Sequence, residues 1–388
     1  MLIEMELQET QVEHRPRLRI AYEATALLGF RTGVGEFCYG ALRALARIGS
    51  LDMNAFAISH RRRHMLKKEL PPGVGFSDWI MPARPLHEMW KRSNFPPLEL
   101  WDRKVDVVHG TNFVVPPTRS AGKVVTVHDL TTLRFPEMCD AATLVFPRMV
   151  QKAIDEGAFV HTPSRFVAQE VIENFRVDPA KVVAIHHGIP LVEPGADFGG
   201  GQMGPLVGRR FVLALGTVEP RKDYPMLVRA FDEVVRHEPD LVLVIAGKDG
   251  WGSSDLTSAI TAIKSRSKIF RLGYVTPAAR QWLLKNATVF AYPSVYEGFG
   301  FPPLEAMALG TPVVSTNSGA LAEVLSDACA LLVDSGDLNG LATGIRRLVV
   351  NEAERARLSQ AGLEHIHRFS WDLCASELES LYRLASRT

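Results

Sequence analysis

The stretch from residue 293 to residue 312 limits the fold most, because it connects two apolar runs through a glycine-rich loop. Residues 289–292 and 313–314 have the short β-branched and aromatic character of buried strands. A proline pair beginning at Pro302 is tolerated in a first helical turn, where N–H groups lack intrahelical partners, and Gly310 is typical of a helix C-terminus. The sequence therefore predicts a strand, a loop, a helix and a second strand in succession.

The loop of this unit carries groups that suit a phosphorylated sugar ligand. Backbone amides around Phe299, Gly300 and Phe301 would point out of the helix N-terminus, where anions bind readily. Glu297 and Glu305 flank that point, and carboxylates accept hydrogen bonds from sugar and ribose hydroxyls. The alternative is that Glu305 only favours the positive end of its helix and that Glu297 is a solvated loop residue.

Short β-rich runs alternate with helical stretches along the rest of the chain, which predicts right-handed βαβ units and parallel sheets. At 388 residues the chain is about right for two domains of roughly 150 to 200 residues. In such sheets ligands bind at the carboxyl ends of the strands. The predicted strands are Leu18–Tyr22, Met53–Ile58, Val105–His109, Val124–His128, Phe159–Thr162, Val182–His186, Phe211–Leu215 and Leu241–Ala246.

A segment rich in glycine and proline, residues 190–208, predicts a linker between the two halves. We therefore expect an N-terminal Rossmann-like domain over residues 1–195 and a C-terminal one over 205–369, with a cleft between them. Residues 1–16 are expected to form a leader. Residues 370–388 have helical spacing, and Ser370 is a suitable N-cap.

Two adjacent cations, Arg221 and Lys222, follow a strand in the second half and stand at the entry of a helix. Arginine binds a diphosphate through its planar fork and lysine as a point charge, although such a dipeptide is also common surface charge. The turn after the next predicted strand contains Lys248, which is either a ligand-binding residue or an ordinary turn residue.

The first half offers two weaker candidates at predicted strand ends. Gly33 and Gly35 lie between a strand and a helix, where glycine permits close backbone approach to a diphosphate. The full G-x-G-x-x-G pattern is absent, which disfavours a dinucleotide site. His128 and Asp129 end another predicted strand, either as functional groups or as a hydrogen-bonded loop anchor.

Composition excludes several classes of protein. Apolar residues make up 46% and charged residues 22%, which is typical of a globular chain, and the net charge of +1 argues against nucleic acid as a partner. No run of eighteen apolar residues and no signal peptide occur, so we expect a cytoplasmic protein. The four cysteines lack C-x-x-C spacing and are expected to be reduced thiols.

A basic run over residues 60–68 is followed by Trp79, Trp90 and Trp101. Basic side chains beside interfacial tryptophans suit an anionic membrane surface, which predicts peripheral association with the inner face of the membrane. The alternative is a solvated basic loop with tryptophans that pack the N-terminal domain.

The string from Glu297 to Val314 closely resembles the E-x7-E signature of retaining glycosyltransferases of the GT-B fold, particularly family 4. The segment from Gly216 to Asp223 resembles the phosphate-binding segment of that family, with Asp223 where asparagine is commoner. The resemblance implies an α/β fold of two Rossmann-like domains and a terminal helix that crosses back to the first domain. It extends over nearly the whole chain and is diffuse before residue 105.

Roles for individual residues follow from the same resemblance. His128 is expected to contact the sugar and the acceptor, with Asp129 as a possible orienting partner. Arg221 and Lys222 would stabilise the leaving diphosphate, Glu297 would hold donor sugar hydroxyls, and Glu305 the ribose. The catalytic residues would be His128, Arg221, Lys222 and Glu297. The donor-binding residues would be Gly33, Gly35, Gly216, Arg221, Lys222, Lys248, Val275, Glu297, Gly298, Phe299, Gly300, Phe301 and Glu305.

The resemblance predicts retaining transfer of a sugar from a nucleotide-sugar donor to a hydroxyl of a glycan or lipid-linked acceptor. GDP-mannose is the first expectation for the donor and a UDP- or dTDP-sugar the second. No D-x-D motif occurs, so we expect no metal or other cofactor to be required. The alternatives are a UDP-sugar epimerase of the GT-B fold and a non-catalytic module that binds nucleotide sugars.

Overall fold

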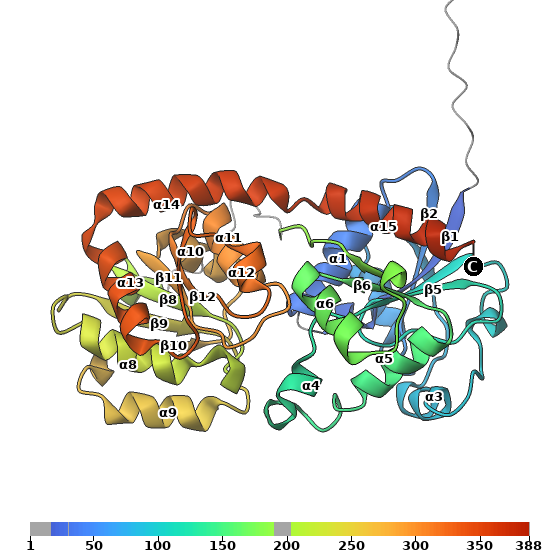
Figure 1. Ribbon diagram of the computed structural model, residues 1–388, viewed down its shortest axis with the longest axis horizontal. Coiled ribbons are helices and arrows are strands. Elements are labelled where there is room, and N and C mark those ends of the chain that lie inside the picture. The colour runs from blue at the N-terminus through green and yellow to red at the C-terminus, as the bar shows by residue number, and fades with distance from the viewer. Residues whose placement is uncertain (1–16, 30, 190–202, 388) are drawn as a thin grey trace, which may run out of the picture.

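The computed structural model describes residues 17–29, 31–189 and 203–387, which form two parallel β-sheets flanked by helices (Figure 1). The expected leader at residues 1–16 lies outside the described residues, as does most of the expected linker. The α/β fold class that the sequence predicts is confirmed by the all-parallel pairing of both sheets.

The first sheet has seven strands in the order β3-β2-β1-β4-β5-β6-β7. Alternate residues of β1 lie in different apolar clusters, with Ile20 and Tyr22 on one face and Ala21 on the other, so the sheet is covered on both sides. Its strands are β1 (Leu18–Glu23), β2 (Leu51–Phe56), β3 (Gly75–Ser77), β4 (Val107–Gly110), β5 (Gly122–Thr126), β6 (Phe159–Thr162) and β7 (Val182–Ala184).

Several details of this sheet differ from the sequence prediction. For example, β2 starts at Leu51 and not at Met53, and β7 ends at Ala184 and not at His186. Strand β5 ends at Thr126, so His128 lies in the loop beyond it and not at the strand end. Strand β3 was not predicted, because its three residues, Gly-Phe-Ser, contain no apolar run. The neighbouring Trp90 is 1% exposed and donates to the Pro96 carbonyl at 3.1 Å, so this tryptophan packs the domain core and does not face a membrane.

The second sheet has six strands in the order β10-β9-β8-β11-β12-β13. Phe211 and Leu213 of β8 face one apolar cluster and Val212 and Ala214 face another, so this sheet is also buried on both sides. Its strands are β8 (Phe211–Leu215), β9 (Val242–Ala246), β10 (Ile269–Gly273), β11 (Val289–Tyr292), β12 (Val313–Thr316) and β13 (Ala330–Val333).

The helices connect the strands and cover the faces of both sheets. Those of the first domain are α1 (Gly33–Leu45), α2 (Leu66–Glu69), α3 (Ala83–Trp90), α4 (Thr131–Arg134), α5 (Phe146–Asp155) and α6 (Arg165–Asn174). Those that follow are α8 (Tyr224–Val234), α9 (Ser253–Ala262), α10 (Pro277–Asn286), α11 (Phe301–Ala308), α12 (Leu321–Val324), α13 (Leu338–Val350), α14 (Glu352–His365) and α15 (Trp371–Ala385). As the sequence predicts, α11 has prolines in its first turn and is followed by Gly310 at a positive φ of 76°.

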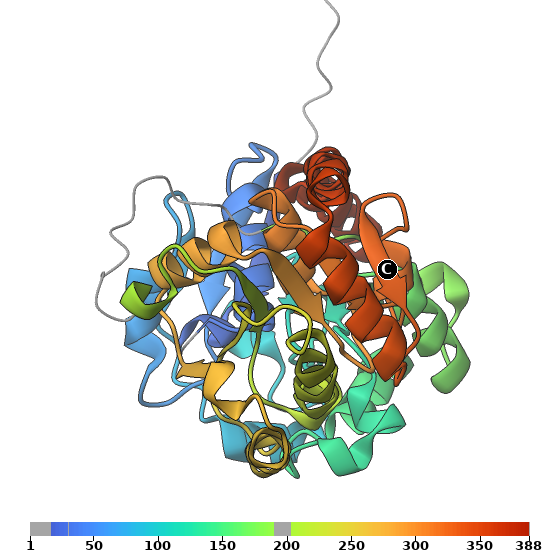
Figure 2. The ribbon, with the colours of Figure 1, turned by 90° about the vertical axis from the view of Figure 1, so that its left-hand side faces the viewer.

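The two C-terminal helices run along one edge of both domains, as the two views in Figures 1 and 2 show. Helix α15 packs on α1 and β5 of the first domain, and the Ser370 hydroxyl caps it by accepting from the Asp372 amide. The buried Tyr382 hydroxyl bonds to His109 Nδ1 at 2.7 Å, which ties α15 to the sheet. One apolar cluster contains residues of both domains, among them Phe37 and Phe301.

Trp371, the first residue of α15, lies against two glycines, and this contact predicts a stability effect. A Cβ added at Gly40 of α1 would overlap the Trp371 ring. Overpacking of this kind costs about 1 to 3 kcal/mol, so we expect Gly40→Ala to lower the free energy of unfolding by that amount in urea denaturation. Gly49→Ala is the matched control, because nothing lies within 4 Å of a Cβ there. Equal stability of the two variants would contradict the proposed packing.

Candidate active site at the domain interface

Glu297 lies at the centre of a buried charged cluster in the loop before α11. Its Oε1 accepts from Lys222 Nζ at 2.5 Å, Ser294 Oγ at 2.5 Å and the Tyr292 hydroxyl at 2.9 Å. Its Oε2 lies 2.7 Å from Arg221 Nη1. Burial alone would raise the pKa of Glu297, but the charges of Arg221 and Lys222 and the hydrogen bonds lower it to about 2. The structure thus brings together three of the four residues predicted to be catalytic.

The two cations are delivered by a short turn between β8 and α8. Pro220–Lys222 forms a 3-10 turn, and Asp223 follows it at φ 42°, in the left-handed region that aspartate and asparagine tolerate better than most residues. The Asp223 carboxylate then caps α8 by accepting from the Met226 amide at 3.2 Å. Either aspartate or asparagine can therefore satisfy this position, which explains why the departure from the family pattern leaves both cations in place.

Two glycines, Gly298 and Gly300, bring the chain before α11 close to the first domain. Gly300 adopts φ 100°, a backbone conformation that would be strained in a residue with a side chain. It turns the chain into the helix. A Cβ at Gly298 would overlap the His128 carbonyl oxygen, so the loop touches the first domain through bare backbone. Phe299 and Phe301 are 5% and 8% exposed, and their rings pack around His187. Only the backbone of these two residues is suited to bind a polar ligand.

Glu305 projects from α11 and is 8% exposed. Its carboxylate is held by Arg280 of α10, with Nε 2.7 Å from Oε2 and Nη2 2.6 Å from Oε1. Phe301, at the start of the same helix, lies 3.6 Å from the position of a Cβ on Gly33. The glycine loop of the first domain and the helix that carries Glu305 therefore meet across the interface.

His128 is buried close to this loop but is not bonded to the Glu297 cluster. Its Nε2 lies 2.8 Å from the Thr111 carbonyl, which can only accept, so this nitrogen carries the proton and Nδ1 is an acceptor. Burial lowers the pKa of His128, so the ring is neutral at pH 7. The Asp129 carboxylate accepts from the Thr131 amide at 2.9 Å, and its charge acts on the His128 ring, so its expected orienting role stays a prediction.

The remaining predicted residues lie at the carboxyl ends of β8, β9 and β10. Gly216 follows β8, and its carbonyl accepts from the Tyr224 hydroxyl at 3.3 Å. The Lys248 carbonyl accepts from the Val218 amide, and its ammonium lies 5.4 Å from the centre of the Tyr274 ring. Val275 follows that ring in the chain. These residues share the sheet edge from which Arg221 projects.

Sequence reasoning missed the residues that dock the loop on the first domain. The Tyr296 hydroxyl lies 2.5 Å from Glu170 Oε2 and accepts from the Leu130 amide at 2.9 Å. Ser164 Oγ donates to the Gly298 carbonyl at 2.8 Å. Glu323 accepts from the Phe166 amide at 2.9 Å in the first turn of α6. The sequence contained one indication of these contacts, the position of Tyr296 next to Glu297, because the residues that Tyr296 and Gly298 contact lie far away in the chain.

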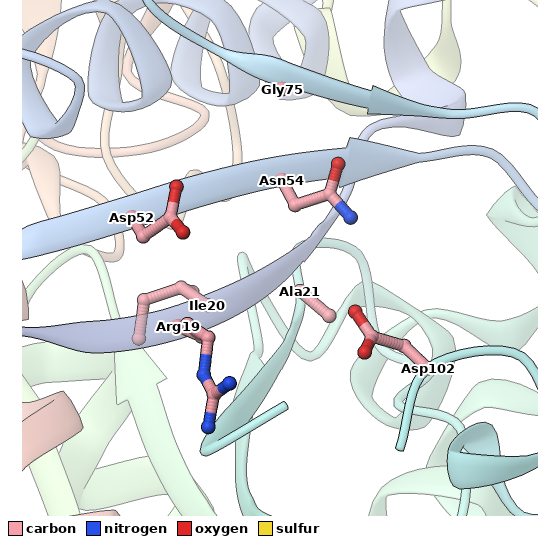
Figure 3. Close-up of a pocket in the computed structure, with 7 residues that line it drawn as sticks. All are labelled: Arg19, Ile20, Ala21, Asp52, Asn54, Gly75 and Asp102. Atoms are coloured by element: carbon pink, nitrogen blue, oxygen red, sulfur yellow. The ribbon is translucent and has the colours of Figure 1, made fainter. Parts of the chain in front are cut away.

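Two hollows lie on the first domain. One of about 160 Å³ is shown in Figure 3, and none of the predicted site residues lines it. It is bordered by Arg19, Ile20, Ala21, Asp52, Asn54, Gly75 and Asp102. The other, of about 300 Å³, is lined by the turns after β1 and β2, with Leu28, Arg62, Met65 and Glu69 among its residues. The larger hollow lies beside the glycine loop, on the side of the sheet where ligands of parallel sheets bind.

Comparison with known proteins places the chain in a family. The model described as "Glycosyl transferases group 1" matches residues 203–365, and the model described as "Glycosyltransferase Family 4" matches residues 31–193. O-antigen chain mannosyltransferase B of Escherichia coli is 30% identical over 292 residues, which cover 74% of this chain and 76% of that protein. A D-inositol 3-phosphate glycosyltransferase of Rhodococcus jostii is 28% identical over 67% of this chain and 61% of its own length.

Solved structures of distantly related proteins have the same fold as this chain. The sucrose-phosphate synthase of Thermosynechococcus elongatus matches with a TM-score of 0.70 at 19% identity, over 95% of this chain and 99% of that one. HepE of Anabaena, in complex with UDP and glucose, matches with a TM-score of 0.70 at 15% identity, over 94% and 98%. The chain belongs to the group 1 glycosyltransferases, and its two domains form the GT-B fold, as the sequence resemblance predicts.

The depressed pKa of Glu297 predicts how stability depends on pH. Because the folded pKa, about 2, lies below the ordinary 4.5, the stabilisation is complete above pH 4.5 and is lost as pH falls towards 2. The shift corresponds to about 3 kcal/mol. We expect Glu297→Gln to lower the free energy of unfolding at pH 7, by urea denaturation, and this difference from wild type to shrink below pH 4.5.

The matched control for this experiment is Glu233→Gln, on the exposed side of α8. It should leave stability within about 0.5 kcal/mol of wild type at each pH. A wild-type advantage over Glu297→Gln that stays constant from pH 7 to pH 3 would show that the Glu297 charge is not what holds the two cations.

Proposed function

We propose that this glycosyltransferase moves a sugar from a nucleotide-sugar donor to a hydroxyl acceptor with retention at the anomeric carbon. The observation that carries the proposal is the pairing of the partly buried Arg221 and the buried Lys222 with Glu297, in the loop before α11 at the interface of two domains. Two cations near the N-terminus of a helix would suit a dianionic leaving group. The proposal of retention is supported by the resemblance of residues 297–314 to the retaining family.

In this proposal Arg221, Lys222 and the amides of residues 299–301 stabilise the charge that develops on the departing diphosphate. Donors fixed in advance around developing charge are typically the largest catalytic contribution. In the structure Glu297 pairs with both cations and Glu219 pairs with Arg221, and a bound diphosphate would supply further negative charge. Glu297 would then accept hydrogen bonds from donor sugar hydroxyls, and His128 Nδ1, an acceptor in the tautomer found, could receive another sugar hydroxyl.

The proton of the acceptor hydroxyl is proposed to pass to an oxygen of the leaving diphosphate on the same face of the sugar. The acceptor oxygen forms the new bond to the anomeric carbon as the bond to the phosphate oxygen breaks. We propose that no divalent metal is needed, because the two cations already face the leaving group.

For the donor we propose GDP-mannose, supported by the 30% identity to a mannosyltransferase. UDP-sugars are the second candidate, supported by a structural neighbour that binds UDP and glucose. For the acceptor we propose a glycan or a lipid-linked sugar. The hollow of about 300 Å³ beside the glycine loop supports this, because it combines apolar Leu28 and Met65 with the charged Arg62 and Glu69.

The proposed chemistry is tested by kinetics on variants of the two cations. Donors are first ranked by thermal shift, since a ligand that binds the folded state raises Tm. With the best donor, we expect Arg221→Ala and Lys222→Ala each to lower kcat/KM about 100-fold or more, because each removes a charge that holds the leaving group. The anomeric configuration of the product, read by NMR, tests retention.

Arg229→Ala, an exposed cation on the neighbouring α8, is the matched control and should keep wild-type kinetics. Loss of less than about threefold in kcat/KM at both cations would refute their role. Release of UDP without any acceptor would favour an epimerase, and donor affinity without transfer or hydrolysis would favour a binding module.

We also propose that the first domain contacts an anionic membrane. Among the described residues, none of the helices is both long and apolar enough to cross a bilayer. Exposed apolar side chains occur in and after the basic run in the sequence, including Met65, Ile80 and Phe95 at 43%, 56% and 54% exposure. Arg61, Arg62, Lys67 and Lys68 of the run are exposed, and each cation near a charged bilayer adds about 1 kcal/mol.

We expect the protein to float with vesicles that contain anionic lipid and to be released by high salt. The triple variant Arg61→Glu, Arg62→Glu and Lys67→Glu should lose this binding, because the charge that attracts the surface is reversed. Arg346→Glu, an exposed cation on α13 of the other domain, serves as the control. Absence of salt-sensitive binding in the wild type would remove the membrane from the proposal.

A further inference from the structure

Glu323, in the single turn of α12, accepts hydrogen bonds from three donors of the first domain. Its Oε1 accepts from the Arg165 amide at 3.1 Å and from His186 Nε2 at 2.7 Å, and its Oε2 accepts from the Phe166 amide at 2.9 Å. Burial raises the pKa of Glu323, but the hydrogen bonds from His186 and from the two amides outweigh burial and lower it, so the carboxylate is charged at pH 7. The side chain is 19% exposed, so water competes only weakly for these bonds.

The two amides that bind Glu323 begin helix α6, where the helix dipole favours a negative charge. Ser164, the N-cap of the same helix, accepts from the Val167 amide at 3.2 Å and donates to the Gly298 carbonyl at 2.8 Å. The start of α6 is therefore bound to the second domain at two points, the Glu323 carboxylate and the Gly298 carbonyl. The bonds to Glu323 are the stronger ones, because hydrogen bonds to a charged acceptor are roughly twice as strong as neutral ones.

Glu323 is joined to the backbone of Glu297 by one helical turn. The Ala320 amide, at the start of that turn, donates to the Glu297 carbonyl at 2.8 Å, and the Glu323 amide donates to the Ala320 carbonyl at 3.0 Å. Gly319 adopts φ 61°, and a Cβ there would lie 2.6 Å from the Glu297 carbonyl oxygen. The segment that carries Glu323 is thus packed directly on the residue that pairs with the two cations.

Domains of one chain can move relative to each other, and contacts at their interface favour one arrangement over others. We propose that Glu323 is a positioning residue, which binds the first turn of α6 and thereby holds the backbone of Glu297 in register with the first domain. The inference rests on the proposed function for its kinetic consequence, since Glu297 and its cations are there assigned to the donor. Glu323 would act through this loop and not by contact with the donor.

The kinetic experiment uses Glu323→Gln, which keeps the size of the side chain and removes its charge. Because apparent affinity falls with the fraction of protein in the binding-competent arrangement, we expect the donor KM to rise about tenfold. Saturating donor restores that arrangement, so kcat should stay within about twofold of wild type. His186→Ala, a milder variant that removes one of the three bonds, should raise KM less, and His186→Gln, whose amide can still donate, should restore most of the wild-type KM.

Hydrogen exchange followed by mass spectrometry tests the same inference without any ligand. In Glu323→Gln we expect segments 164–168 and 318–322 to exchange about fivefold faster or more, because the amides of Phe166 and Ala320 lose protection together. Glu99→Gln is the matched control, since Glu99 accepts from the amides of Arg119, Ser120 and Ala121 within the first domain alone. It should leave the donor KM and the exchange of both segments unchanged.

Wild-type exchange of segment 318–322 in both Glu323→Gln and His186→Ala would overturn the inference, because Glu323 would then not be coupled to the loop. A lower Tm with unchanged donor KM would also overturn it, since a purely structural contact would behave in that way. Failure of every nucleotide sugar to bind the wild type would instead reject the proposed function, and the exchange measurement would still decide whether Glu323 holds the loop.

Discussion

The contact between Glu297 and the adjacent Arg221 and Lys222 is the constraint on which the rest of the site depends. Two neighbouring cations repel each other, and Lys222 also loses hydration because it is buried. The buried Glu297 carboxylate with its four donors, together with Glu219 beside Arg221, offsets these losses. Burial and the charge of Arg221 lower the pKa of Lys222, and the charge of Glu297 only partly offsets these two effects. The Glu297 carboxylate therefore holds both cations in place.

The backbone around Glu297 contacts both domains, and the neighbouring Gly298 allows the close contact with the first domain. On one side Gly298 touches the His128 carbonyl and receives a hydrogen bond from Ser164. On the other side the Glu297 carbonyl accepts from the Ala320 amide, at 2.8 Å. A Cβ at Gly298 would overlap the His128 carbonyl oxygen, so the lack of a side chain there allows the loop to approach the first domain this closely.

The sequence predicted the features that depend on neighbours in the chain and missed those that depend on the fold. The strand, loop and helix around Glu297 were predicted because prolines, glycines and apolar runs act locally. The bond between Tyr296 and Glu170 joins residues 126 positions apart, and that between Ser164 and Gly298 joins residues 134 apart, so no local pattern could indicate them. Arg280 is an ordinary helix residue in the sequence, and only the packing of α10 beside α11 pairs it with Glu305.

The same loop carries the interdomain bond and the charged cluster in consecutive residues, and this couples the two domains to the chemistry. Tyr296 is bonded to Glu170 of the first domain, while the next residue holds the cations of the second. A movement that separates the domains by more than a hydrogen-bond length must break the Tyr296 bond and pull on the backbone of Glu297. Because Arg134 also pairs with Glu170, at 2.6 Å, the first domain offers a charged and hence strong anchor at this point. The geometry of the cations therefore depends on the docking of the domains.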